Sequence, residues 1–264
     1  MLTTKGAVVC VLLAVAAAVI FYPRTGGKPD APFQRPLSPL EKKAVEFSSR
    51  GVVSIVSRGR SPGIFYDNGI NGLWSKIYPG TAIGPNTIVV ERVATIGAGE
   101  IFVHYQDGRR INAIPEWESL SEGIAVLKTE EKLLSWVPLA SESSYYGELV
   151  AVSSGHGEKQ VSSGEIYGIN ESYGTMDVSI GEGEGAPNYN GSPVFDSDGK
   201  VVSFLVGSVF SCIGADSSRG GTAFETGKRC RRAITARNFC DNYKKCAGMA
   251  PAPLGEKHYV RAGN

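Results

Sequence analysis

The residues best suited to chemistry lie in the segment from Ala186 to Phe195, which reads Ala-Pro-Asn-Tyr-Asn-Gly-Ser-Pro-Val-Phe. A turn-forming Asp-Ser-Asp-Gly-Lys stretch and an apolar run follow it. A serine in such a loop becomes a nucleophile when a neighbouring base takes its proton, and Ser192 is one candidate. Asn190 is a different case, because no neighbouring base can deprotonate its amide for attack on a carbonyl. The loop therefore suggests acyl-transfer chemistry. Whether this chain can perform it depends on whether a nucleophile, a base and an orienting acid are present.

This segment resembles the nucleophile loop of trypsin-like and HtrA-type serine proteases, which reads Asn-Pro-Gly-Asn-Ser-Gly-Gly-Pro. Alignment on Pro193 places Asn190 at the nucleophile position and Ser192 at the second glycine. The resemblance implies that three neighbouring residues, Asn188, Tyr189 and Gly191, form the vestige of the loop that binds the oxyanion in active proteases. Asn188 replaces a glycine that normally permits this turn, so the resemblance implies a degenerate loop.

The two other members of the catalytic triad are also substituted. Gly80 to Ala94 resembles the family segment that ends in Asn-x-His-Val, in which the histidine is the general base, but here the histidine is replaced by Arg92 or deleted beside it. A guanidinium stays protonated and cannot act as a base. The family signature Asp-Leu-Ala-Val-Leu-Lys supplies the orienting aspartate, and its position falls on Gly123. Glu122 is adjacent, but successive residues of an extended segment point to opposite sides.

The histidines offer no replacement for the base. His104 lies within an alternating segment and is interpreted as a surface strand residue. His156 falls in a glycine-rich turn, and His258 lies near the C-terminus. No Cys-x-x-Cys pair with a nearby histidine is present, so we expect neither a metal nor a cofactor.

The order of short strands and glycine turns predicts an all-β fold. The resemblance implies two six-stranded antiparallel β-barrels of the trypsin type and a short C-terminal helix. The apolar run near the N-terminus predicts a membrane helix before them. The expected boundaries are a membrane helix at 1–23, a linker at 24–37, a double-barrel domain at 38–247 and a tail at 248–264. Within the domain, barrel one is expected at about 51–130, barrel two at about 136–236 and the helix at about 237–247. We expect no PDZ domain.

The N-terminus has the layout of a signal anchor. Gly6 to Tyr22 carries no charge and follows Lys5. A cleaved signal peptide and a core helix remain alternatives, because small residues around Ala17 offer a cleavage site. We expect the domain on the exoplasmic side of the membrane, or secreted if the signal is cleaved.

Charge and cysteine usage fit an exported protein. The chain has 27 Lys and Arg against 26 Asp and Glu, with no basic block to neutralise a phosphate backbone, so nucleic acid is not an expected partner. Four cysteines in the last quarter of the chain are expected to form disulfides, with three connectivities open: Cys212, Cys230, Cys240 and Cys246. By analogy with trypsin-like proteins, at least one bridge should involve the Cys212 and Cys230 region.

Three functions are compatible with these observations. The favoured one is a membrane-anchored pseudoprotease that binds an unknown protein or extended peptide by strand addition. In the second, the alignment is shifted and Ser192 is the nucleophile of an active endopeptidase. The third is a structural or assembly subunit with no ligand in its cleft. A serine-directed probe separates the second from the others, and peptide binding separates the first from the third.

Overall fold

The computed structural model describes residues 37–60, 73–105, 108–140, 149–155, 158–170, 172–180, 189–216 and 222–246. The chain divides into two units, Met1–Pro36 and Leu37–Asn264, and all described residues belong to the second. The apolar N-terminal run, the linker up to residue 36 and the tail lie outside the described residues. Within the described ranges, no helix is long and apolar enough to cross a membrane.

Helix α2 (Pro39–Gly51) opens the domain with the capping box that its sequence indicates. The Glu41 backbone N–H donates to Ser38 Oγ (3.2 Å), and the Ser38 N–H donates to the Glu41 carboxylate (2.8 Å). The helix continues to Gly51. Its last residue, Gly51, lies so close to Val137 and the Ala82 carbonyl that a Cβ there would come within 3.0 Å of both. Helix α2 is therefore seated directly on the body of the domain.

Barrel one is a closed antiparallel barrel in the order β1-β2-β3-β6-β5-β4. Its strands are β1 (Val52–Arg60), β2 (Leu73–Gly84), β3 (Thr87–Glu91), β4 (Ala98–His104), β5 (Arg110–Ser119) and β6 (Ile124–Thr129). Alternate residues point inward and form a buried core that includes Ile55, Ile88 and Val103. The β1–β2 ladder extends to Arg60 and Leu73. Trp74 pairs with Gly59 in this ladder, and its ring lies against Gly59.

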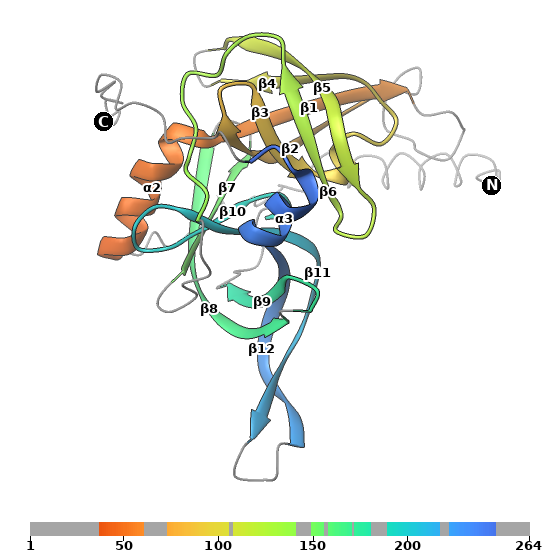
Figure 1. The fold of residues 1–264 in the computed structure, drawn as a ribbon. Coiled ribbons are helices and arrows are strands. Elements are labelled where there is room, and N and C mark those ends of the chain that lie inside the picture. Colours follow the sequence, from red (N-terminus) through yellow and green to blue (C-terminus); the bar gives the residue numbers. More distant parts are fainter. Residues whose placement is uncertain are drawn as a thin grey trace, which may run out of the picture. The chain divides into compact units, whose positions relative to one another are not determined.

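Barrel two is also closed and antiparallel, in the order β10-β11-β12-β9-β8-β7. Its strands are β7 (Leu149–Gly155), β8 (Glu158–Asn170), β9 (Thr175–Ile180), β10 (Pro193–Phe195), β11 (Val201–Asp216) and β12 (Thr222–Thr235). Strands β11 and β12 continue together beyond the other strands of the barrel (Figure 1). The fold is thus all-β with two six-stranded barrels and a short C-terminal helix, as the resemblance implies.

A separate buried cluster joins the two barrels. It combines Val89 and Val126 of barrel one with Phe195 and Phe204 of barrel two. Helix α3 (Ala236–Tyr243) adds Phe239, which is fully buried. The barrels therefore share an apolar core, and residues at the adjoining strand ends are held in fixed positions.

The four C-terminal cysteines form two disulfides, Cys212–Cys230 and Cys240–Cys246. This is one of the three pairings that the sequence left open. The first links β11 to β12, where Phe210 pairs with Cys230 in the ladder. The second joins α3 to the residues that follow it.

Replacing Cys212 and Cys230 by serine should lower the free energy of unfolding by about 3 kcal/mol, because the bridge closes a loop with a sequence separation of 18 residues. Denaturant unfolding of the oxidised natural protein and of the double variant measures the difference. Equal unfolding midpoints for the two would contradict it.

Candidate functional site

The loop before β10 is anchored in barrel two. The side chain of Tyr189 is 3% exposed and belongs to the barrel-two core. The Ser192 N–H donates to the Tyr189 carbonyl (2.9 Å), and the Gly191 N–H donates to the Leu205 carbonyl (2.7 Å). Two amides near the expected oxyanion position are thus committed to internal hydrogen bonds. Asn188, the remaining residue of that expected loop, lies outside the described residues.

Gly191 is where this loop meets barrel one. Its φ is +83°, and a Cβ there would lie 2.7 Å from the Glu91 backbone nitrogen and 3.0 Å from the Pro79 carbonyl oxygen. Only glycine fits this close approach and backbone conformation without strain. The turn therefore places Asn190 directly against the end of β3.

Both ends of the Asn190 amide are hydrogen-bonded. Its Nδ2 donates to Glu91 Oε1 (2.8 Å), and its Oδ1 accepts from Arg231 Nη1 (3.0 Å). Arg231 Nη1 also lies 3.5 Å from the Gly207 carbonyl oxygen. The three side chains come from β3, the loop before β10, and β12. We call this set, Glu91, Asn190 and Arg231, the amide bridge.

The amide bridge also affects a neighbouring tyrosine. Tyr78 is 5% exposed. Burial raises the pKa of Tyr78, and the negative charge of Glu91 raises it further. The phenol therefore stays neutral at physiological pH and cannot supply a base.

The expected positions of the general base, Arg92, and of the orienting acid, Gly123, lie next to each other in space. Arg92 opens the 3₁₀ helix η2 (Arg92–Ala94), and its N–H donates to the Gly123 carbonyl (2.8 Å). Its guanidinium Nε pairs with Glu118 Oε2 (3.2 Å). Gly123 has φ +70°, and no atom lies within 4 Å of a Cβ built there. Arg92 thus contacts Gly123 through the backbone, and the residue before Arg92, Glu91, contacts Asn190.

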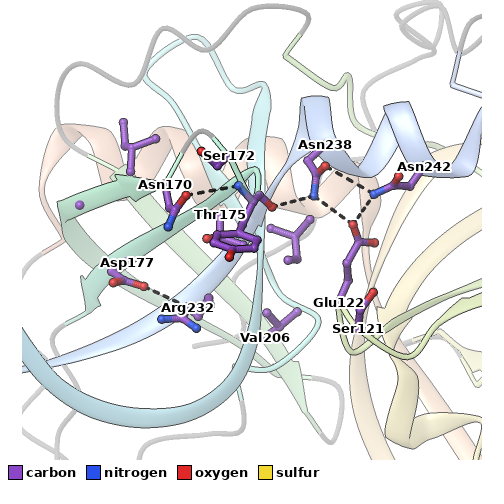
Figure 2. Close-up of a pocket in the computed structure, with 14 residues that line it drawn as sticks. Ser121, Glu122, Asn170, Ser172, Thr175, Asp177, Val206, Arg232, Asn238 and Asn242 are labelled. Carbon is purple, nitrogen blue, oxygen red and sulfur yellow. Dashed lines mark hydrogen bonds and ion pairs between the residues drawn. The ribbon is translucent and has the colours of Figure 1, made fainter.

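Glu122 does not point to this centre. Its Oε1 accepts hydrogen bonds from Asn238 Nδ2 (2.9 Å) and from Asn242 Nδ2, both on α3. Figure 2 shows the carboxylate reaching toward the helix. Glu122 therefore connects the β5–β6 turn to α3.

The alternative nucleophile is enclosed. Ser192 is 0% exposed, and its hydroxyl has no hydrogen-bond partner among the described residues. A nucleophile needs access to substrate and a base within hydrogen-bonding distance. This environment provides neither.

The histidines do not approach the site in the part of the chain that the structure describes. His104 ends β4, is half-buried, and lies opposite Ser54 and Arg110 in the sheet. His156 and His258 lie outside the described residues. The same described ranges hold no cluster of three or more potential metal ligands.

Residues 82–203 match the family model of the trypsin-like peptidase domain. This region of the chain is similar to a trypsin-like peptidase domain. The match begins in β2, ends in β11 and includes Arg92, Gly123 and Asn190. Together with the two closed barrels, it fits the trypsin-like serine protease family. Comparison with curated proteins gave no match.

Two adjoining pockets of the trypsin-like domain form a groove beside the amide bridge. The first, of about 610 Å³, is lined mainly by polar side chains of the β8–β9 turn, β12 and α3 (Figure 2). Because Asn170, Asn238 and Asn242 contribute to it, we call it the amide pocket. The second, of about 570 Å³, has apolar side chains from both barrels and is called the apolar pocket: Val93, Leu120, Val206 and Phe210.

The groove gathers exposed apolar side chains. Val93 and Leu120 at the apolar pocket are 47% and 78% exposed. Ile169 and Tyr173 at the amide pocket are 42% and 74% exposed. Clustered exposed apolar residues of this kind are typical of interaction sites.

The pairing of strand β11 with its neighbours is interrupted along this groove. Its ladder with β12 is interrupted between Val206 and Phe210, and its pairing with β10 ends at Phe204. Among the described strands, none pairs with residues 207–209. Gly207, which lines the apolar pocket, has φ +76°. An extended peptide can form main-chain hydrogen bonds to such a segment.

Three components of the site were not found from the sequence. Glu91, Arg231 and the two asparagines of α3 are distant in the chain from the motif residues that they contact. Glu91 directly precedes Arg92, the expected base position, and this was only a weak indication that Glu91 belongs to the site. The sequence gave no indication of the role of Arg231, because its contact with Asn190 depends on how β12 closes the barrel.

Proposed function

We propose that this trypsin-like domain has no proteolytic activity and binds an extended segment of a partner protein in the groove between its barrels. The observation that carries the proposal is the amide bridge. The side chain at the nucleophile position has no hydroxyl, and Glu91 and Arg231 hold both ends of its amide. Without a nucleophile, its base and its orienting acid, the acylation step is missing.

The burial of Ser192 supports the same proposal. A shifted alignment would need Ser192 to reach a substrate carbonyl, yet the residue is fully buried. Its backbone is also fixed, because its carbonyl accepts from the Leu205 N–H (2.9 Å). Exposing the hydroxyl would require this loop to come away from β11.

Binding is supported by the groove. Gly207, at the break in the β11–β12 ladder, and the exposed side chains Val93 and Leu120 line one pocket. Strand addition needs both components, main-chain hydrogen bonds for affinity and side-chain pockets for selectivity. A purely structural subunit would require neither the main-chain hydrogen bonds nor the side-chain pockets.

Peptide arrays test the binding proposal. We expect the natural protein to bind a subset of extended peptides, and Leu120→Asp to weaken that binding about tenfold by placing a charge in the apolar pocket. Leu134→Asp is the matched control, because Leu134 is also exposed (63%) but does not line either pocket. Absence of binding to any peptide would favour the structural-subunit alternative.

We further propose that the uncharged run from Gly6 to Tyr22 anchors the protein in a membrane, with the domain on the exoplasmic side. The two disulfides support export to an oxidising compartment. Protease treatment of intact cells should degrade the domain, and full protection would overturn this placement. Recovery of the protein from the medium without residues 1–23 would instead indicate a cleaved signal.

A further inference from the structure

The charged side chains that line the groove are already engaged. Each of the five has at least one partner within the domain: Glu91 with Asn190, Arg92 with Glu118, Glu122 Oε1 with two amides of α3, and Arg232 with Asp177. Glu122 Oε2 is buried and has no hydrogen-bond partner among the described residues, so a ligand N–H or O–H can donate to it. An acidic ligand side chain would have to separate one of the pairs or remain unpaired, and either loses binding free energy. The groove therefore disfavours acidic occupants and accommodates an uncharged hydrogen-bond donor.

Arg232 stands where the two pockets meet. It lines both of them, and its Nε pairs with Asp177 Oδ1 at the amide pocket (3.3 Å). On the other side, its guanidinium carbon lies 5.6 Å from the centre of the Phe210 ring at the apolar pocket. Asp177 thus neutralises the cation that both pockets share.

The two pockets differ in what they can hold. The apolar pocket offers Val93, Leu120, Val206 and Phe210, which a large aliphatic or aromatic side chain can cover. The amide pocket offers hydroxyl and carboxamide groups from Asn170, Ser172, Thr175 and α3, which match a carboxamide or hydroxyl that both donates and accepts. In an extended peptide, side chains two residues apart point to the same side.

We propose that the groove selects uncharged peptides in which a large apolar side chain, held in the apolar pocket, lies two residues from an Asn, Gln, Ser or Thr side chain held in the amide pocket. This inference rests on the proposed peptide-binding function. It adds a sequence preference, and it identifies Asp177 as the residue that excludes acidic side chains by neutralising Arg232.

A positional peptide library measured against the full-length protein in mild detergent tests this preference. We expect the best binders to carry the apolar and carboxamide or hydroxyl residues at that spacing. Replacing the Gln of such a peptide by Glu should weaken binding to the natural protein about tenfold. In Asp177→Asn, Arg232 loses its carboxylate partner, so the same replacement should weaken binding threefold or less.

Glu165→Gln is the matched control. It also removes a surface carboxylate from barrel two, one that pairs with Lys228 (3.0 Å), but it lies outside both pockets. The penalty for Glu should stay at its natural value in this variant. Binders without the apolar and polar pair, or an unchanged penalty in Asp177→Asn, would overturn the preference while leaving peptide binding intact. A library without any binder would reject the binding function itself.

Discussion

Restoring serine at position 190 alone is expected to give no measurable proteolysis. The Asn190→Ser side chain would have a hydroxyl but no base, because the Arg92 guanidinium stays protonated and pairs with Glu118. Triad residues act as a unit, so restoring one of them returns almost none of the roughly 10⁶-fold acceleration that a complete triad provides. The assay is hydrolysis of casein and of a mixed peptide library by the purified variant.

The triple variant Asn190→Ser, Arg92→His and Gly123→Asp should be weakly active at best. Gly123 has φ +70°, which costs an aspartate about 1–2 kcal/mol, and the space within 4 Å of its Cβ is open, so no neighbouring atom packs against the base of the new side chain. The Gly191 amide also remains bonded to Leu205. Measurable turnover by the single variant, at a rate equal to or above that of the triple, would refute the view that all three positions must be restored together.

Replacing Phe239 by alanine should lower the free energy of unfolding by about 3–5 kcal/mol, because the ring is fully buried. The ring makes an edge contact with Phe204 of barrel two (5.3 Å between centroids) and another with Trp117 of barrel one (6.1 Å). Its loss would leave a cavity where α3 joins the two barrels. Chemical denaturation of the natural protein and of Phe239→Ala measures the cost.

The control for this variant is Tyr173→Ala, which removes an aromatic ring that is 74% exposed. It should change stability by no more than about 0.5 kcal/mol. A similar loss in both variants would show that Phe239 has no special role in joining the barrels.

Much of the fold was predictable because local patterns and turn residues determine it. The segment from Ser38 to Glu41 is typical of a capped helix start, and the alternating apolar residues of β9 are typical of a strand. The first and last residues of the helices and strands were harder to predict. Helix α2 runs on to Gly51 and β2 begins at Leu73, because packing against other segments extends both.

The site was only partly predictable for a related reason. Arg92, Gly123 and Asn190 could be named from motifs, since each lies beside a recognisable strand. The partners of Asn190 could not, because Glu91 is 99 residues and Arg231 41 residues away in the chain. Long-range contacts of this kind depend on barrel closure, and no local sequence pattern predicts them.

The central claim, that this trypsin-like domain is not a protease, is tested most directly by turnover measurements on the purified natural protein. Casein and a mixed peptide library serve as substrates, and a fluorophosphonate probe reports any activated serine. The account predicts no turnover above the buffer control and no labelling, with Asn190→Ala and Ser192→Ala indistinguishable from the natural protein. Turnover that Ser192→Ala abolishes and Asn190→Ala does not would contradict the account and identify Ser192 as the nucleophile of an active enzyme.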